Sequence, residues 1–214
     1  MPDPNNFPDY FRHYAWEGKH ALYGYPGDQF PEFKWILSLE GRFAWLRLQH
    51  GTRPTASIYL LREMIQWGGS QNGILQKFDD GIGEVNLYQK ITEVIANLAH
   101  PGDAIEAALG VPGMGLTYAS KMLRFFDPDT YGALDSRIKK ALYERVPNAI
   151  PKIHDGNVNS MVNGYVEFIA YLGSLKEDLD RRKIIRPECN LPPCRGTAGW
   201  RAADIEMALF SWAV

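Results

Sequence analysis

Apolar residues recur every three or four positions along most of the chain, the spacing that places them on one face of a helix. The clearest example is segment 55–67, where an apolar stripe is followed by Gly68 and Gly69, a strong helix stop. No segment alternates cleanly between apolar and polar residues over more than four or five positions. The pattern therefore predicts an all-α protein.

Other segments share this helical spacing. They are 31–49, 74–78, 85–98, 101–109, 116–126, 136–145 and 161–176, together with a terminal helix that begins at Ala202 or Ala203. Within 31–49 we expect Gly41 to interrupt the helix, because glycine is a poor helix former. We expect residues 31–214 to form one helical domain.

The first thirty residues differ from the rest in composition. Segment 1–30 is rich in Pro, Gly, Asn and aromatic residues, which predicts an irregular conformation. The candidate anchoring side chains are Tyr10, Phe11, Tyr14, Trp16, Tyr23 and Tyr25. We expect aromatic residues of this segment to anchor it on the helical domain, and stacking on nucleic-acid bases is the alternative.

Composition is that of an ordinary soluble globular protein, with 45% hydrophobic and 22% charged residues in 214. The net charge of −2 lacks the basic excess that usually accompanies nucleic-acid binding. A nearly neutral chain can still hold a few phosphates through backbone N–H groups and a local basic patch. The charge therefore weakens a nucleic-acid interpretation without excluding it.

The sequence offers no sign of a metal centre or of export. The only cysteines, Cys189 and Cys194, have no histidine near them in sequence, so two free thiols in a reducing cytoplasm are expected and a metal site is not. There is no signal-peptide pattern and no run of eighteen apolar residues. We expect a cytoplasmic, monomeric protein without a cofactor and without membrane association.

One stretch, 111–135, combines an unusual backbone with a candidate chemistry. Pro112, Gly113 and Gly115 form a PGxG turn between the predicted helices 101–109 and 116–126. Such a turn exposes successive backbone N–H groups at a helix start, an arrangement that suits a phosphate. Glycine allows both positive φ and close approach of a ligand. A purely structural turn between helices is the alternative.

Together with Asp135, this turn suggests a family. The residues VPGMGLTYASKML at 111–123 and GALDSRI at 132–138 resemble the helix-hairpin-helix and catalytic aspartate of the HhH-GPD base-excision DNA glycosylase superfamily, which includes the endonuclease III, adenine-mismatch and 8-oxoguanine glycosylases. The resemblance covers about 25 residues. It implies a two-lobed all-α glycosylase-like fold that clasps double-stranded DNA and receives an extruded base between the lobes.

The same resemblance assigns roles to particular residues. Pro112, Gly113, Met114 and Gly115 match the hairpin that grips a DNA phosphate, with Thr117 beside it. Asp135 matches the aspartate that assists departure of the flipped base. Many members also hold an iron–sulfur cluster with four cysteines, which the two cysteines of this chain cannot do. The Gly or Pro that members carry just before the aspartate is matched loosely by Gly132.

A departure from the family concerns the nucleophile. Bifunctional members place a lysine two residues after the second hairpin glycine, where this chain has Thr117. A threonine has no amine to form a Schiff base, so the resemblance favours a monofunctional enzyme that uses water. Lys121 lies one helical turn further on, and a relocated lysine nucleophile is the alternative to a structural or phosphate-contacting role.

Two further interpretations stay open. The sequence QWGGSQNG places Gln66, Trp67, Gln71 and Asn72 around a tight turn, as a base pocket or a duplex wedge would need, or simply as a helix end followed by a polar loop. Asp135 is also a natural N-cap for helix 136–145. If capping is its only role, the chain is a non-catalytic DNA-binding or protein-interaction module.

Overall fold

The computed structural model describes residues 2–14, 31–49, 54–83, 85–187 and 199–214. Most of these residues are helical and none of them lies in a strand, which confirms the all-α prediction for the described ranges. The helices are the 3-10 helices η1 (Pro4–Asn6) and η3 (Gln71–Gly73), and α1 (Phe7–Arg12), α2 (Pro31–Leu48), α3 (Pro54–Trp67), α4 (Ile74–Gly81), α5 (Leu87–Ala96), α6 (Pro101–Leu109), α7 (Leu116–Phe126), α8 (Ser136–Arg145), α9 (Val158–Arg181) and α10 (Ala202–Trp212).

Two expectations about local structure are wrong. Helix α2 runs through Gly41 without a break. The glycine lies on an exposed part of the helix, while Leu39, Phe43 and Leu46 continue one buried stripe on both sides of it. Burial of that stripe outweighs the roughly 1 kcal/mol that glycine costs in a helix.

The N-terminal segment is not wholly irregular. Asp3 caps η1 by accepting a hydrogen bond from the Asn5 N–H at 3.0 Å, and α1 follows directly. The aromatic anchoring is confirmed for Phe11, whose buried ring packs edge-on against Trp200, and for Tyr10 and Tyr14, which are half-buried against the core. Phe7, which was not among the expected anchors, is buried against the same Trp200. Trp16, Tyr23 and Tyr25 lie outside the described residues.

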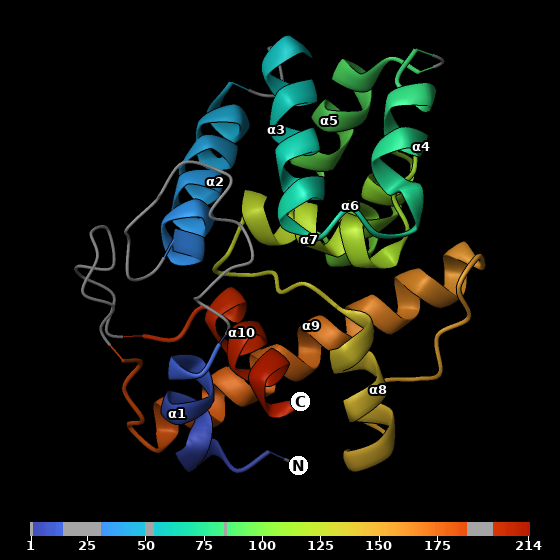
Figure 1. Ribbon diagram of the computed structural model, residues 1–214. Helices are drawn as coiled ribbons and strands as arrows, with labels where there is room; N and C mark the ends of the chain where they lie inside the picture. Colours follow the sequence, from blue (N-terminus) through green and yellow to red (C-terminus); the bar gives the residue numbers. More distant parts are fainter. Residues whose placement is uncertain (1, 15–30, 50–53, 84, 188–198) are drawn as a thin grey trace.

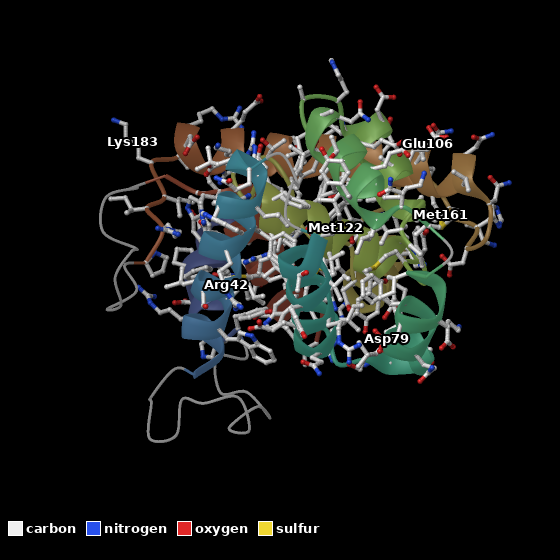
Figure 2. All side chains as sticks on the ribbon, turned by 90° about the horizontal axis from the view of Figure 1, so that it is seen from above. Arg42, Asp79, Glu106, Met122, Met161 and Lys183 are labelled. Carbon is white, nitrogen blue, oxygen red and sulfur yellow. The ribbon has the colours of Figure 1, made fainter. Side chains whose placement is uncertain are left out.

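The helices form two groups with α7 and the segment after it between them (Figure 1). One group contains α2 to α6, and the other contains α1, α8, α9 and α10. Helix α7 packs on α2, α3 and α6, and the segment 127–135, which begins with a turn at 128–130, then crosses to α8. Figure 2 shows Met122 of α7 near the centre of the molecule, with the charged Arg42, Glu106 and Lys183 at its periphery.

Helix α7 is the core helix of the fold. Every residue from Tyr118 to Phe126 is buried, including the polar side chains of Ser120, Lys121 and Arg124. A buried polar side chain is costly unless it is hydrogen-bonded or paired. The polar residues of this helix therefore need specific partners.

Arg124 finds its partners in a buried charge network that joins α2, α7 and α10. The fully buried guanidinium lies 2.8 Å from Glu40 Oε1 and 3.8 Å from Glu206 Oε2. Arg201 links Glu40, at 2.9 Å, to Asp204, at 2.8 Å. Since α2 and α10 belong to different helix groups, these ion pairs hold the two groups together.

Candidate active-site cleft

Hydrogen bonds to several helices hold the segment that carries Asp135 in place. The Tyr131 hydroxyl donates to the Leu98 carbonyl at 2.6 Å, and the Tyr165 hydroxyl donates to the Gly132 carbonyl at 3.0 Å. The Leu134 N–H donates to Ser120 Oγ at 2.9 Å, and the Thr117 hydroxyl donates to the Leu134 carbonyl at 3.4 Å. The segment is thereby fixed to helices of both groups.

Asp135 is the N-cap of α8, as its position in the sequence predicts. Its Oδ1 accepts a hydrogen bond from the Arg137 N–H at 2.8 Å. Its Oδ2 accepts none from the described part of the chain. The residue is half-buried and borders two cavities. Capping therefore uses one carboxylate oxygen and leaves the other for a ligand.

The two cavities share a wall. The first, here called the hairpin chamber, has a volume of about 540 Å³ and extends from the glycine hairpin to Asp155 and Met161. The second, the aromatic chamber, has a volume of about 550 Å³ and is bordered by Tyr14, Trp67 and Phe210. The residues that border both are Gly68, Gln71, Lys121, Asp135 and Ser136.

The hairpin is shaped by its contacts with α4. Gly113 has φ of +74°, and a Cβ there would lie 3.0 Å from the Phe78 backbone nitrogen. Pro112 packs on Gly81, where a Cβ would lie 2.5 Å from the Pro112 ring. Glycine is therefore required at 81 and 113 by close packing, whatever ligand the hairpin binds.

Gly115 differs from Gly113. Its φ of −83° is ordinary, and a Cβ would meet nothing within 4 Å. Gly115 is the N-cap of α7 and borders the hairpin chamber, and the N–H groups of Leu116 and Thr117 have no acceptor among the described residues. Packing gives no reason for glycine here, and the open space leaves these N–H groups accessible to a ligand.

Lys121 is a buried amine in the wall between the chambers. Its side chain is enclosed by Trp67, whose ring centroid is 5.5 Å from Nζ, and by Tyr118, at 4.9 Å. Nζ donates one hydrogen bond, to the Gly68 carbonyl at 3.4 Å. Burial lowers the pKa of this amine below its usual 10.5, although Asp135 and Glu206 oppose the shift. The amine is thus more readily deprotonated than that of an exposed lysine.

A tight loop after α3 forms the outer edge of the shared wall. Gly69, Ser70, Asn72 and Gly73 all have positive φ, an uncommon conformation for serine. The Gln71 N–H donates to the Tyr118 hydroxyl at 3.2 Å, and that hydroxyl donates to the Gly68 carbonyl at 3.2 Å. These bonds fix the loop so that Gln71 is exposed at the border of both chambers.

Most of the site residues expected from the sequence meet in this cleft. Gly113, Met114, Gly115, Thr117 and Asn72 border the hairpin chamber, Trp67 borders the aromatic chamber, and Gln71, Lys121 and Asp135 border both. Pro112 and Gln66 border neither chamber. Pro112 packs on Gly81 of α4, and Gln66 is half-buried on α3.

The sequence analysis missed the contribution of the chain ends to the aromatic chamber. Glu206 and Phe210 of α10 and Tyr14 after α1 border this chamber. Phe210 packs edge-on against Tyr14, and the Arg137 guanidinium lies 4.4 Å from the Phe210 ring centroid. The one available signal was Glu206, an acidic residue in the otherwise apolar run IEMALF.

Basic side chains gather around the two chambers despite the net negative charge of the chain. They are Lys77, Lys121, Arg137, Lys139 and Lys140. Among the acidic residues of the same walls, Asp155 is paired with Lys139 at 3.0 Å. The cleft therefore offers a locally cationic surface to an anion.

Comparison of the chain with protein-family models, with curated proteins and with solved structures found no match. In the described ranges, no group of three or more His, Cys, Asp and Glu side chains is arranged to hold a metal ion. No helix in the described part of the chain is long and apolar enough to cross a membrane.

Proposed function

We propose that this protein is a monofunctional DNA glycosylase of the helix-hairpin-helix type, in which two helical lobes clasp double-stranded DNA and a modified base is flipped out and excised. The observation that carries the proposal is the position of Asp135. It lies in the wall between a chamber with unpaired hairpin N–H groups and a chamber with aromatic sides, and one of its carboxylate oxygens is available to a ligand.

Each chamber suits one part of a flipped nucleotide. The N–H groups at the start of α7 and the surrounding lysines favour a phosphate in the hairpin chamber. The rings of Trp67 and Phe210 border the aromatic chamber and give it apolar sides that suit a base. The sugar then lies between them, beside Asp135.

The chemistry follows from that placement. As the C1′–N bond breaks, its electron pair leaves with the base and positive charge develops at C1′. The Asp135 carboxylate stabilises this charge and orients a water molecule, which adds to C1′, and the proton that the water loses neutralises the departed base. A preorganised carboxylate in a desolvated site is worth roughly 3 kcal/mol in the transition state.

The proposal also includes that the protein is a monomer and acts on DNA in the cytoplasm.

A second candidate is a bifunctional glycosylase/lyase that uses Lys121, and the buried, pKa-lowered amine favours it. The neutral amine attacks C1′, the base leaves with the electron pair of the glycosidic bond, and opening of the sugar ring yields an iminium ion. This candidate needs the same chambers and the same aspartate.

The test of the proposed function is release of bases from duplex DNA. A panel of duplexes, each with a different oxidised, deaminated, alkylated or mismatched base, is incubated with the protein and scored for abasic sites. We expect one class to be processed, and we expect Asp135→Asn to lower the rate by roughly 100- to 1,000-fold. Asparagine caps helices well, so folding and duplex binding are retained.

Asp155→Asn is the matched control, because it changes the other aspartate of the hairpin chamber, which is already paired with Lys139. It is expected to keep most of the activity. Equal rates for Asp135→Asn and wild type would exclude the proposed mechanism. Tight duplex binding without base release from any substrate would instead favour a non-catalytic DNA-binding module.

A further inference from the structure

Glu206 is a buried carboxyl in the wall of the aromatic chamber. It lies on α10, is 4% exposed, and accepts a hydrogen bond from the Ala133 N–H. Gly132 makes room for it, since a Cβ at 132 would lie 2.8 Å from Glu206 Cβ. Asp135 follows three residues later in the same extended segment. The fold thus packs a second carboxyl closely against the segment that presents the proposed catalytic one.

Several charged and titratable groups surround this carboxyl. Arg124 of α7 lies 3.8 Å away and is itself paired more closely with Glu40 of α2. Lys121 and Asp135 act on it through charge, and it acts in the same way on Tyr165 of α9. From α8, Arg137 and Lys140 border the chamber. On its own helix, Asp204 is paired with Arg186 and Arg201.

We propose that Glu206 is the base-recognition residue of the aromatic chamber, and that the chamber takes an uncharged base that presents a carbonyl oxygen or an unprotonated ring nitrogen to the Glu206 O–H group. This inference rests on the proposed function, because it names the substrate class of the same site. It assigns Glu206 to selection of the base and leaves bond cleavage to Asp135.

The chemistry of the walls supports this class of base. A neutral carboxyl donates one hydrogen bond, and a base with an acceptor edge pairs with it. Burial raises the pKa of Glu206 from 4.5 to about 7, with an additional rise from Asp135, while Arg124 and Lys121 oppose the shift. The carboxyl therefore keeps its proton through the mildly acidic range and loses it above neutral pH.

A cationic alkylated base fits the chamber poorly. Three basic side chains, Lys121, Arg137 and Lys140, border it, whereas its carboxyls are those of Asp135, which keeps one oxygen for the sugar, and of Glu206, which holds a proton. A positive base would meet like charge there. Oxidised and deaminated bases, which are neutral and carry carbonyl groups, meet a hydrogen-bond donor instead.

Binding of free bases to the intact protein tests this inference without requiring base release. Saturation-transfer NMR is used with hypoxanthine and uracil as neutral carbonyl bases, and with the 3,9-dimethyladeninium ion as a permanently cationic base. We expect the neutral bases to bind and the cation to bind at least tenfold more weakly. We also expect affinity for the neutral bases to fall about tenfold from pH 6 to pH 8, because the protonated fraction of a group with pKa about 7 falls in that proportion.

Variants assign this pH dependence to one side chain. Glu206→Gln keeps a donor that does not titrate, so neutral bases should bind with a flat profile. Glu206→Ala should bind them more weakly at pH 6. Glu167→Gln, on the exposed face of α9 and in another part of the surface, is the matched control and should follow wild type.

The wild-type protein provides a readout that does not depend on how well a variant folds. With ¹³C-labelled glutamate, the carboxyl signal that titrates near neutral pH should shift its midpoint upward when hypoxanthine is added, because the base binds the protonated form. A flat wild-type profile, an unchanged midpoint or preferential binding of the cation would overturn the inference. If a protein with such a flat profile still releases a base from DNA, the proposed glycosylase function stands and only the role of Glu206 is wrong. If the protein binds neutral bases selectively but releases none from DNA, the proposed glycosylase function is wrong and the role of Glu206 in base binding stands.

Discussion

At the scale of single residues, the cleft depends on side chains whose surroundings change their chemistry. Lys121 is the clearest case. An exposed lysine at this position would be a protonated, solvated cation, but here the amine is 8% exposed and lies between two aromatic rings. Burial disfavours its charged form and lowers its pKa. The same side chain is then a possible nucleophile, which the sequence spacing alone did not favour.

Borohydride trapping distinguishes the two candidate mechanisms. If the Lys121 amine attacks C1′, reduction during turnover should yield a covalent protein–DNA adduct in wild type and none in Lys121→Ala. Lys140→Ala is the matched control, since Lys140 borders the same chamber but is 75% exposed and paired with Glu144. An adduct that persists in Lys121→Ala would exclude this lysine. Base release by wild type without any adduct would leave water as the nucleophile.

Residues with a local role could be predicted, and residues whose role depends on distant packing could not. The N-cap position of Asp135 follows from its neighbours, because capping uses only the next few N–H groups. The place of Glu206 depends on contact between α10 and Gly132, which are far apart in sequence. No local pattern specifies such a contact.

At the scale of elements, the hairpin and the helix after it are determined by short-range signals. The bounds of α6 and α7 agree with the predicted 101–109 and 116–126. The continuity of α2 was not predictable in this way, because a glycine signal of about 1 kcal/mol competes there with burial of a whole apolar stripe. Local sequence signals determine the structure where they are strong and where no burial of apolar residues opposes them, as at the PGxG turn.

The two glycines of the hairpin should respond differently to alanine. Gly113→Ala combines positive φ with a Cβ close to the backbone of α4, so we expect a loss of roughly 2 kcal/mol or more in the free energy of unfolding. Gly115→Ala meets no neighbour and has ordinary φ, so its stability should stay within about 1 kcal/mol of wild type. Urea unfolding measures both.

Duplex binding separates a structural glycine from a ligand-contacting one. If N–H groups at the start of α7 hold a phosphate, the added methyl of Gly115→Ala should weaken binding about tenfold in fluorescence anisotropy while the fold is intact. Gly41→Ala, in an exposed part of α2, is the control and should leave affinity unchanged. Unchanged affinity in Gly115→Ala would show that the hairpin is only a structural turn.

At the scale of the whole molecule, buried ion pairs determine which helix groups pack together, and the apolar pattern of the single helices does not. The apolar stripes predict that helices pack, but they do not specify which helix groups meet. Arg124 is fully buried, lies 2.8 Å from Glu40 of α2 and 3.8 Å from Glu206 of α10, and is thus paired most closely with Glu40. Removing one partner of a buried ion pair leaves an uncompensated charge, typically at a cost of about 3–5 kcal/mol. The network therefore specifies the arrangement of α2, α7 and α10 as much as it stabilises it.

This network makes global stability depend on pH through Glu206. In the unfolded chain the carboxyl titrates near 4.5, whereas in the folded protein burial raises its pKa to about 7. Between these values the native state binds more protons, so its stability falls as pH rises. The contribution is fully present below pH 4.5 and is lost as pH passes about 7. The two pKa values together correspond to a contribution on the order of 3 kcal/mol.

Comparison with Glu206→Gln isolates this contribution, because glutamine has nearly the same shape and does not titrate. Urea unfolding of both proteins at pH 5, 6, 7 and 8 should show that wild type loses stability relative to the variant, by on the order of 3 kcal/mol across the series. Other titrating groups are common to both proteins and largely cancel in the difference. A difference that does not change with pH would mean that Arg124 keeps Glu206 ionised in the native state, and the carboxyl could then not donate a hydrogen bond to a base.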